Sequence, residues 1–570
     1  MAMKELASRG LLALAAVAIG FAAADTYVVV LALPDMMTAA GLTVAELQRA
    51  APIISGFLLG YVAVLPLIGR VSDLRGRVPV LIGCLVIFAI GSVITAAGYD
   101  LTTIVLGRLI QGIGGGGLIP PTLALIADTW PAERRGLPLG IVGAVQELGS
   151  VVGPLWGAAI LAFGTWHDIF WLNAAVGLLI GAALLRHRPA EHERGWDVPG
   201  LLLALLAGGC LLLVMLEPER LTTGVTSGLA FLPVAGDSRW LTPLALVGYG
   251  LLVAFAVRQA TAARPLLAWR AWGEVARQTD LWGATALTVA LGAVILTFAS
   301  AEPEQAVVSE DAIVLLPVAA IALGLFVWRG RHAAHPLIPR DSLTATPAWG
   351  SIAVSFFVGS ALIAALVDIP FFARLTIAPD DQLEAALVLL RFLVALPVGA
   401  VLGGWLLRHL PAGPLTGAAL ALSGGCFLVM ATWDQKSLES FTSTIVLAAC
   451  GLGFGLAIAP VNAALLEHTA DDVHGLASAL LVVARMVGML IGISALTTLG
   501  LRAFHSAVER IPPIEELCNG SATACRAYNG AMRDAGIAQL QAVFTGAAVA
   551  AFVAAALALL LLRRRASFSS

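Results

Sequence analysis

The segment Gly69-Arg-Val-Ser-Asp73-Leu-Arg75-Gly76-Arg77 joins two long apolar runs, near residues 50–69 and 78–98. It predicts a tight turn between two helices, because Gly76 can adopt the backbone conformation that such a turn needs. Gly69 would let a neighbouring helix approach closely, and the Asp73 carboxylate can pair with an arginine or with the positive end of another helix. We therefore expect a charge-to-dipole latch that can open and close. The alternative is a charged loop that only sets the topology.

The whole chain has the composition of a protein that lies in lipid. Its 570 residues are 59% hydrophobic and only 12% charged, with a mean hydropathy of +0.92, whereas soluble domains carry about 25% charged residues. A bilayer core of about 30 Å needs about 20 apolar residues per helix. The sequence has about sixteen such runs, which predicts an all-α polytopic membrane protein; they lie near residues 10–33, 50–69, 78–98, 101–127, 137–162, 169–186, 198–216, 241–257, 280–301, 311–328, 348–372, 384–407, 412–432, 442–466, 475–503 and 540–562. Neither this composition nor the net charge of -3 indicates a nucleic-acid partner.

The distribution of arginine predicts how the chain crosses the membrane. Arginine clusters occupy alternate loops, whereas the other loops are acidic or mixed; the clusters are Arg70/Arg75/Arg77, Arg134/Arg135, Arg186/Arg188/Arg194, Arg258/Arg264/Arg270, Arg329/Arg331/Arg340, Arg408 and Arg563/Arg564/Arg565. Positively charged loops stay on the cytoplasmic side of a membrane. We therefore expect these loops and both termini in the cytoplasm, with the chain in the inner membrane.

The apolar runs divide the chain into three parts. Residues 1–190 and 346–570 each hold six predicted membrane helices, and residues 191–345 form a linker with four more. The last part includes a predicted periplasmic hairpin over residues 503–540.

The linker contains a weak internal repeat. Residues 198–220 resemble 281–305, and residues 247–267 resemble 318–338. A duplicated two-helix hairpin explains both pairs, and chance similarity between Ala/Leu-rich segments is the alternative.

The run 101–127 carries a second motif, Arg108-Leu-Ile-Gln111-Gly112. An arginine well inside an apolar helix is costly, so a functional role is the first hypothesis for Arg108. The alternative is that Arg108 snorkels or makes a structural hydrogen bond.

A third motif, Gly149-x-x-x-Gly153-Pro154-x-x-Gly157, lies in the run 137–162. Its three glycines share one helix face and permit close packing of another helix, while Pro154 loosens the local backbone hydrogen bonding. Ordinary small-residue packing is the alternative explanation.

These three motifs resemble those of the major facilitator superfamily. The loop matches the pattern Gly-x-x-x-Asp-x-x-Gly-Arg of that superfamily, and the glycine motif looks like the antiporter motif of its drug exporters. The resemblance implies two six-helix bundles around a central cavity, each built from two inverted three-helix repeats. It also implies export rather than uptake.

Three further segments narrow the resemblance. Asp25-Thr26-Tyr27-Val28-Val29, Phe392-Leu-Val-Ala-Leu-Pro397-Val-Gly399-Ala and Val482-Val-Ala-Arg485-Met486-Val-Gly488-Met-Leu-Ile-Gly492 resemble mycobacterial and actinobacterial triacylglyceride exporters that work with a cell-envelope lipoprotein. The resemblance implies a lipid substrate, coupling to protons, a periplasmic lipoprotein partner and a monomeric transporter without a cofactor or metal. This chain departs from that family in having four predicted linker helices instead of two.

Three ionisable residues lie near mid-depth of predicted helices: Asp25, Glu147 and Arg485. A lone charge at the bilayer centre costs at least about 2.5–3.5 kcal/mol, so each should face the interior and find a partner. Arg485 keeps its charge, whereas a carboxylate can take up a proton. We expect Arg485 to pair with Asp25 or with Glu147 and to tie the two bundles together until the acid is protonated. A permanent ion pair that only holds the fold is the alternative.

The 503–540 hairpin is consistent with a lipid substrate. Phe504, Val508 and Ile511 continue a helical stripe beyond the predicted membrane span, and Tyr528, Met532 and Ala535 repeat that spacing on the return. Two projecting helices could shield an acyl chain, and an ordinary amphipathic hairpin is the alternative. Between them, Cys518 and Cys525 could form a disulfide if the loop faces an oxidising compartment.

Two other classes of function remain open. A proton-coupled multidrug antiporter would use the same motifs, because drugs and lipids both need a large apolar cavity. A membrane enzyme would need a paired nucleophile and base, for which the candidate clusters are His167/Asp168 and His468/Asp471/Asp472. The sequence has no Gly-x-x-x-x-Gly-Lys phosphate loop, no metal-spaced His/Cys cluster and no nucleophile elbow, so ATP drive and enzyme chemistry lack support.

Overall fold

The computed structural model describes residues 2–42, 47–187, 197–262, 265–266, 269–299, 311–340, 342–377, 382–512 and 526–562. Fifteen helices in these ranges are long and apolar enough to cross a membrane, and the bent pair α2 and α3 brings the number to sixteen if it forms one span. The prediction of an all-α polytopic protein with about sixteen spans is therefore confirmed.

The first part of the chain forms a bundle in which α1 packs on α7, α2 on α5, and α4 on α5 and α8. We call it the N-bundle; its helices are α1 (Ala2–Ala39), α2 (Leu47–Ala63), α3 (Leu65–Arg75), α4 (Arg77–Ala96), α5 (Leu101–Gly116), α6 (Ile119–Thr129), α7 (Gly136–Phe163) and α8 (Trp166–Leu184). The run 101–127 lies in one candidate span, Leu101–Thr129, as expected, with a short break between α5 and α6. Pro120 and Pro121 near the start of α6 lack the backbone N–H that an unbroken helix needs.

The last part forms the C-bundle, in which α15 packs on α19 and α21, and α18 packs on α16 and α17. Its helices are α15 (Thr346–Thr376), α16 (Gln382–Leu406), α17 (Ala412–Met430), α18 (Phe441–Glu467), α19 (His474–Val508) and α21 (Arg526–Leu561). Buried aromatic rings fill its core, with Phe427 stacked on Phe544 and edge-on to Phe454.

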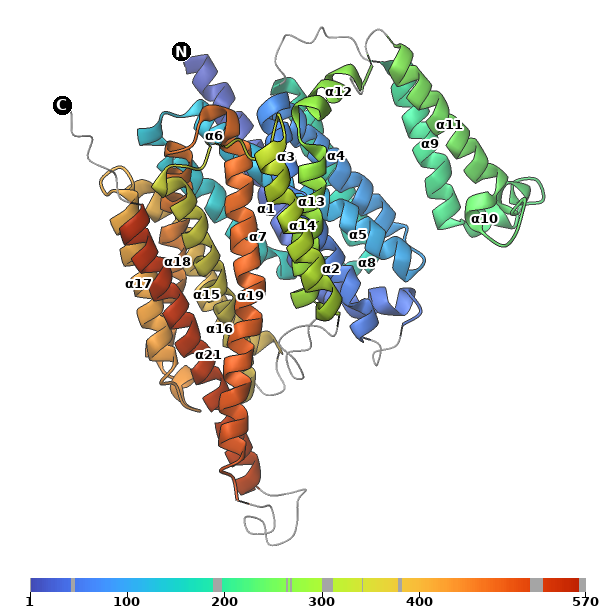
Figure 1. The fold of residues 1–570 in the computed structure, drawn as a ribbon. Helices are drawn as coiled ribbons and strands as arrows, with labels where there is room; N and C mark the ends of the chain where they lie inside the picture. The colour runs from blue at the N-terminus through green and yellow to red at the C-terminus, as the bar shows by residue number, and fades with distance from the viewer. Residues whose placement is uncertain are drawn as a thin grey trace, which may run out of the picture.

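Helix α1 begins and α21 ends at the same end of the molecule, which we call the terminal face (Figure 1). The two bundles meet in this half: α19 packs on α3 and α6, and α7 packs on α16 and α18. The contact between α7 and α16 is backbone to backbone, since a Cβ atom added to Gly404 would lie 2.3 Å from the carbonyl oxygen of Gly136.

The linker forms two hairpins. One consists of α9 (Val198–Leu216) and α11 (Pro243–Thr261), and the other of α13 (Leu281–Ala299) and α14 (Ala312–His332). The short helices α10 (Glu219–Thr222) and α12 (Trp269–Gln278) lie in the connecting segments.

The two hairpins repeat the same polar anchor, which supports the duplication inferred from the sequence. Asp197 Oδ1 accepts the N–H of Gly200 at 3.1 Å and faces Arg258 Nε at 3.0 Å. In the second hairpin Asp280 Oδ1 accepts the N–H of Gly283 at 3.1 Å and faces Arg329 Nε at 2.9 Å.

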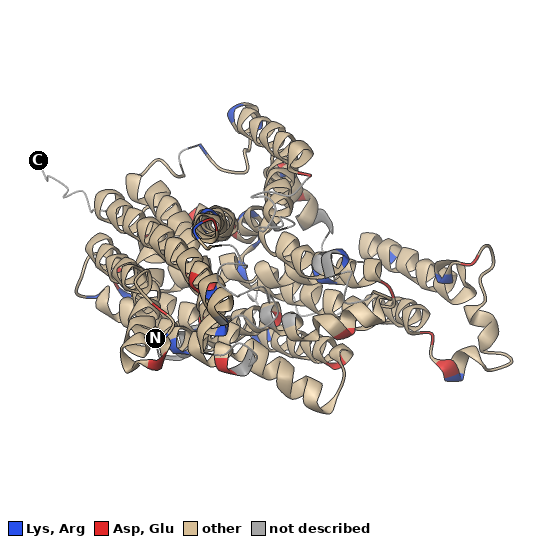
Figure 2. Cartoon of the chain, turned by 90° about the horizontal axis from the view of Figure 1, so that it is seen from below, with Lys and Arg blue, Asp and Glu red and all other residues tan. Residues whose placement is uncertain are grey.

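The two hairpins differ in how they pack. In α13, Thr288 donates a hydrogen bond to the Ala63 carbonyl of α2 at 3.1 Å, and Ile295 is fully buried. The α9 and α11 pair instead stands away from both bundles (Figure 1). In both hairpins, as in the bundles, most of the helix surface is free of charged residues (Figure 2). The loop that connects α9 and α11 reaches the N-bundle at Tyr99, where Trp240 Nε1 donates to the hydroxyl at 3.0 Å and the Arg239 guanidinium lies 3.5 Å from the ring centroid.

Helices α19 and α21 extend beyond the rest of the C-bundle at the end opposite the terminal face (Figure 1). Phe504, Val508 and Ile511 are half-buried there, whereas Arg502 and Glu509 are exposed. The predicted helical extension is therefore present, with its apolar stripe on the covered side. Cys518 and Cys525 lie outside the described residues, and within them Cys84, Cys210, Cys426 and Cys450 are free thiols.

Candidate functional site

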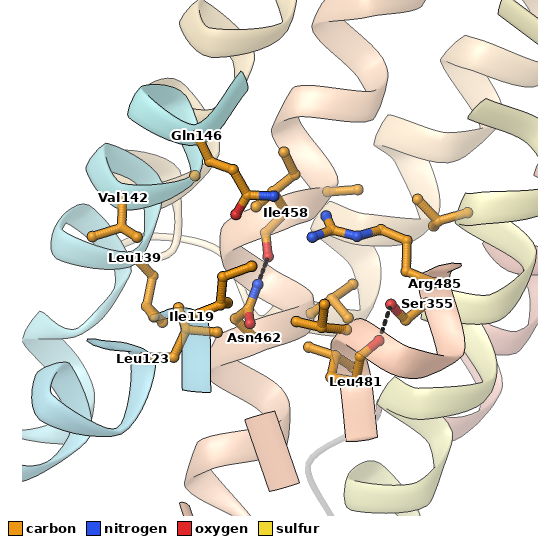
Figure 3. Close-up of a pocket in the computed structure, with 15 residues that line it drawn as sticks. Ile119, Leu123, Leu139, Val142, Gln146, Ser355, Ile458, Asn462, Leu481 and Arg485 are labelled. Atoms are coloured by element: carbon orange, nitrogen blue, oxygen red, sulfur yellow. Dashed lines mark hydrogen bonds between the residues drawn. The ribbon is translucent and has the colours of Figure 1, made fainter. Parts of the chain in front are cut away.

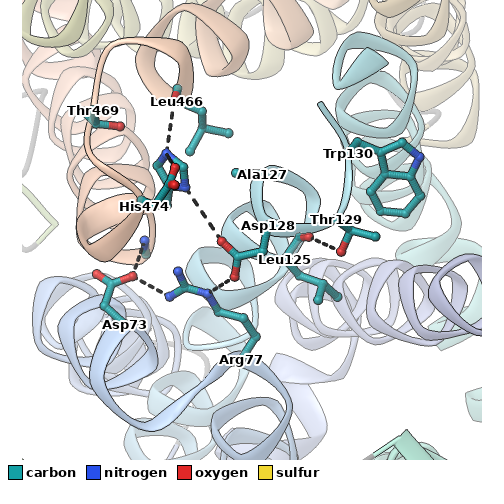
Figure 4. A network of polar contacts seen from close by, with 12 residues as sticks. Asp73, Arg77, Leu125, Ala127, Asp128, Thr129, Trp130, Leu466, Thr469 and His474 are labelled. Atoms are coloured by element: carbon teal, nitrogen blue, oxygen red, sulfur yellow. Dashed lines mark hydrogen bonds and ion pairs between the residues drawn. The ribbon is translucent and has the colours of Figure 1, made fainter. Parts of the chain in front are cut away.

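The Asp73 carboxylate joins the two bundles at the terminal face. It lies near the end of α3, and its two oxygens accept the N–H groups of Gly475 at 2.8 Å and Leu476 at 3.0 Å (Figure 4). These amides belong to the first turn of α19, where backbone N–H groups have no partner within the helix and the helix dipole favours a negative charge. Of the two partners predicted for Asp73, an arginine or a helix N-terminus, the structure provides the helix N-terminus of the other bundle and also an arginine, Arg77.

The glycines of the same loop allow this approach. A Cβ atom on Gly69 would lie 2.5 Å from the carbonyl oxygen of Gly475, so a larger residue would push α3 and α19 apart. Gly76 has a φ of +95°, which is strained for residues with a side chain, and it ends α3 directly before α4 begins. Arg75 is the half-buried last residue of α3.

Arg77 links Asp73 to a second carboxylate. Its guanidinium pairs with Asp73 and, through Nε, with Asp128 Oδ2 of α6 at 2.8 Å. The other oxygen of Asp128 faces the His474 ring at the start of α19, with Nδ1 at 3.8 Å (Figure 4). Asp73, Arg77, Asp128 and His474 therefore form a chain of charges that crosses the boundary between the bundles, and we call it the latch network.

Two arginines add contacts between the bundles on this face. Arg70 donates to the Asp472 carbonyl at 3.2 Å, and Arg135 donates to the Leu466 carbonyl at 3.4 Å. The Leu466 carbonyl also lies 3.1 Å from His474 Nε2. The terminal face is closed in this structure.

A cavity lies between the bundles, and its roughly 570 Å³ of empty space includes space open to solvent (Figure 3). It is lined by residues of α6, α7, α15, α18 and α19, and none of its lining residues comes from the linker hairpins. This agrees with the expectation that the extra helices lie outside the central cavity. The wall is mostly apolar, and its polar side chains are Gln146, Ser355, Asn462 and Arg485.

Arg485 of the C-bundle lies near enough to Glu147 of the N-bundle for its charge to act on that carboxylate. Arg485 projects into the cavity from α19 (Figure 3). Its charge acts on the half-buried Glu147 of α7, although the interaction falls short of a direct ion pair. Of the two acids expected to pair with Arg485, the structure brings Glu147 near it.

Asp25 has a different partner from the one expected. Its Oδ2 pairs with Arg108 Nη1 at 2.8 Å, and its Oδ1 accepts from Asn173, so all three residues belong to the N-bundle. Both side chains of the ion pair are buried, with exposures of 1% for Arg108 and 0% for Asp25. The expected contact between Asp25 and Arg485 is therefore wrong, because a fully buried arginine within the same bundle satisfies the carboxylate.

The α5 motif completes this buried group. Arg108 donates to Gln111 Oε1 at 2.7 Å, and Gln111 donates to Ser92 of α4 at 2.9 Å. The guanidinium of Arg108 also lies 4.2 Å from the ring centroid of Phe57. Gly112 permits the approach of α2, because an added Cβ would lie 2.1 Å from the Phe57 carbonyl oxygen. Arg108 therefore makes structural contacts and does not snorkel.

The glycine motif of α7 packs against α1. Added Cβ atoms would lie 2.1 Å from the Gly20 carbonyl oxygen at Gly149 and 2.4 Å from the Ala24 carbonyl oxygen at Gly153. At Gly157 the nearest atom belongs to the Val28 side chain, at 3.2 Å. Pro154 lies inside the helix, which continues without a break to Phe163.

The two clusters considered for an enzyme have other roles here. His167 contacts the Ala96 carbonyl at 2.7 Å, and Asp168 caps the start of α8 through Thr165. His468 contacts the Ala464 carbonyl at 2.9 Å, at the end of α18. These groups join or end helices, and neither cluster pairs a nucleophile with a base.

Comparison with known proteins agrees with this architecture. A sequence model of the Major Facilitator Superfamily matches residues 15–328, more than half of the chain. The chain belongs to the major facilitator superfamily. As a member of this superfamily it is a multi-pass membrane transporter, with the fold that the sequence motifs predicted.

Among the relatives of this facilitator are proteins named triacylglyceride transporters. It is 33% identical to a triacylglyceride transporter of Mycolicibacterium smegmatis over 85% of this chain and 74% of that protein. It is 32% identical to a triacylglyceride transporter of Mycobacterium tuberculosis over 89% of this chain and 86% of that protein.

Solved structures of facilitators share the fold. The human organic anion transporter MFSD10 matches with a TM-score of 0.54 at 14% identity, over 97% of this chain and 99% of that one. The proton:xylose symporter XylE matches with a TM-score of 0.52 at 13% identity, over 97% and 94% of the two chains.

Sequence reasoning missed four residues of this facilitator's polar groups: Asn173, Asp128, His474 and Gln146. Asn173 carried a usable signal, because an amide inside an apolar helix needs a partner. Asp128 and His474 lie at helix ends, where charged residues are common, so only the assembled bundles show that they meet.

Proposed function

We propose that this protein is a secondary active exporter that moves a triacylglyceride-like lipid from the inner membrane toward the periplasm. The names of its relatives support the substrate class. The observation that carries the mechanism is the binding of Asp73 to the first turn of α19, because it is a contact between two bundles that can be made and broken. The protein then works by alternating access, with the terminal face in the cytoplasm.

The closed terminal face corresponds to the outward-facing stage of that cycle. Opening it requires the loss of the two Asp73 hydrogen bonds and of the arginine contacts to Asp472 and Leu466. Hydrogen bonds to charged groups contribute about 1.5–3 kcal/mol each. A few such bonds hold one conformation without making it permanent.

Proton coupling is assigned to Glu147 and Arg485. A charged Glu147 attracts the cavity arginine of the opposite bundle, and protonation of Glu147 removes that attraction. The bundles can then part at this level. Asp25, which pairs with Arg108 inside the N-bundle, is a second acid that a proton could neutralise.

The projecting α19 and α21 hairpin is the proposed exit for lipid. Its covered apolar stripe continues from the C-bundle beyond the membrane span, and it could shield an acyl chain from water. A periplasmic lipoprotein that accepts lipid at this hairpin, and a monomeric transporter, complete the proposal.

A multidrug exporter is the second candidate, because the mostly apolar cavity wall with four polar side chains would also suit a drug-sized ligand. Export of a lipid with three long acyl chains requires the cavity to widen or the lipid to enter only in part.

Reconstitution into vesicles tests the proposal. Purified protein is inserted with a labelled triacylglyceride, a proton gradient is imposed or collapsed, and lipid transfer to acceptor particles is measured. We expect gradient-dependent transfer that empty vesicles lack. Transport of a cationic dye without any lipid transfer would support the multidrug exporter instead.

A further inference from the structure

His474 is a buried histidine between acceptors of both bundles. Its residue exposure is 1%, and it is the first residue of α19. Nε2 faces the Leu466 carbonyl at 3.1 Å and Asp471 at 3.7 Å, both of the C-bundle. Nδ1 faces Asp128 of the N-bundle at 3.8 Å and has no hydrogen-bond partner.

A neutral imidazole cannot satisfy this arrangement. It carries one N–H, and its other nitrogen is an acceptor. If Nε2 donates to Leu466, the lone pair of Nδ1 points toward the Asp128 carboxylate, which is also an acceptor. Only the imidazolium, which donates from both nitrogens, matches acceptors on both sides.

The charges around His474 also favour a cation. On the N-bundle side lie Asp128, Asp73 and Arg77, and Arg135 shares the Leu466 carbonyl. Asp471 adds a carboxylate from the C-bundle side. Three carboxylates and two guanidiniums leave one negative charge, and the nearby Arg70 and Asp472 do not change that sum. A proton on His474 neutralises the group.

We propose that His474 is a proton-binding site that forms when the bundles close at the terminal face and is lost when they part. Asp128 lies on one bundle, while His474, Leu466 and Asp471 lie on the other, so opening removes the acceptor of Nδ1. The proton comes from the terminal side and returns to it. This site is distinct from Glu147 and Arg485. It rests on the proposed function in one respect only: the proton comes from the cytoplasm if the terminal face lies there.

The site makes closure of the terminal face depend on pH. One proton bound only in the closed state shifts the ratio of closed to open molecules by at most about tenfold per pH unit. Acidification therefore favours the closed terminal face, and alkaline conditions favour the open one.

Distance measurements between spin labels test the proposal on the full chain in nanodiscs. The six cysteines are replaced by alanine, and labels are placed at the exposed positions Glu133 and Arg408, which lie on different bundles at the terminal face. The populations of short and long distances are recorded between pH 5.5 and 8.5, without substrate. A failure of lipid transport would therefore not affect the result.

The matched variants are His474→Gln and His468→Gln. His468 lies six residues earlier and contacts only a backbone carbonyl of its own helix among the described contacts, so its variant should keep the wild-type pH response. In His474→Gln we expect loss of the pH response. An unchanged response in that variant would overturn the proposal.

A second variant covers the case in which His474→Gln does not fold. Asp471 is 95% exposed and lies 3.7 Å from Nε2, so Asp471→Asn should fold normally. It removes one negative charge beside the imidazolium, and the midpoint of closure should move to lower pH. A midpoint that stays in place or rises would contradict a proton on His474.

Discussion

The ionisable residues of this chain differ in the partner that each one finds. Asp73 binds the start of a helix in the opposite bundle, and Asp25 pairs with a buried arginine of its own bundle. Glu147 feels the charge of Arg485, which belongs to the opposite bundle. A contact between the bundles breaks when the bundles separate, whereas a contact within one bundle is kept when that bundle moves. The position of the partner therefore distinguishes contacts that join the two bundles from contacts that stay within one bundle.

Asp73→Asn should weaken closure of the terminal face. The amide oxygen can accept one of the two α19 N–H groups, but the negative charge at the helix end and the pairing with Arg77 are lost. The expected loss is about 1.5–3 kcal/mol, seen as more long distances between labels on the two bundles. Asp168→Asn is the control, because Asp168 caps α8 without joining the bundles; an equal effect there would rule out a specific latch.

Glu147→Gln and Asp25→Asn should both abolish gradient-driven export, with different effects on stability. Glu147 has no direct ion pair, so its variant should reach normal membrane abundance. Asp25→Asn leaves Arg108 buried without a countercharge, which costs about 3–5 kcal/mol for a buried pair. Export assays and thermal unfolding of both proteins measure this, and full gradient-driven export by both would end the proton-switch hypothesis.

Helix packing in both bundles depends on close backbone approach. The glycines of α7 bring it against α1 along one face and against α16 at Gly136 and Gly140. Lipid provides no hydrophobic drive between helices, so association depends on contacts of this kind. Helix α7 thus packs on α1 within the N-bundle and on α16 across the boundary between the two bundles.

Gly149→Ala should destabilise the N-bundle. Its methyl group would meet the Gly20 carbonyl oxygen at 2.1 Å, so α1 and α7 must separate, and overpacking costs about 1–3 kcal/mol. Thermal unfolding in detergent should show a lower midpoint. Gly425→Ala is the matched control, because nothing lies within 4 Å of its added methyl group; equal midpoints for both variants would contradict the prediction.

Shortening the projecting hairpin should impair lipid export more than folding. Replacing residues 504–532 by a short Gly/Ser linker removes Phe504, Val508, Ile511, Tyr528 and Met532 and leaves the apolar runs 475–503 and 540–562 in place. Membrane insertion and abundance should therefore stay normal, while lipid transfer to acceptor particles falls. Export at the normal rate would exclude a shielding role for the hairpin.

On the scale of the whole molecule, the two duplicated hairpins have become different. The α13 and α14 hairpin packs on α2 and reaches α19, whereas the α9 and α11 hairpin contacts the N-bundle through Tyr99. The same Asp–Arg ion pair therefore occurs in a hairpin that packs on the bundles and in one that stands apart from them.

Deleting the two hairpins separately should show this difference. Removal of residues 197–262 should leave the thermal midpoint of the remaining protein nearly unchanged, because few contacts cross to the bundles. Removal of residues 280–332 exposes the buried face around Ile295 and the Ala63 carbonyl, and should lower that midpoint. Thermal unfolding of both proteins in detergent checks this, and a larger loss from the first deletion would contradict it.

Much of the fold was predictable because each apolar run must satisfy its own backbone hydrogen bonds in lipid. That requirement makes every run a helix wherever it lies, so the number of spans could be read from composition alone. The Asp73 partner was also predictable, since a carboxylate beside a glycine-rich turn suits a helix N-terminus.

The choice among possible partners was decided only by the tertiary structure. The sequence left Arg485 with two possible acids, Asp25 and Glu147. Packing of α1 against α5 and α8 placed Arg108 and Asn173 beside Asp25. His474 and Asp128 lie more than 300 residues apart in the chain and meet only where α6 touches α19. The sequence by itself thus determined the helices, their number and the charge at the latch, because these depend on local composition. The pairing of buried charges and the split between a docked and a detached hairpin depend on which helix faces meet, which only the assembled bundles determine.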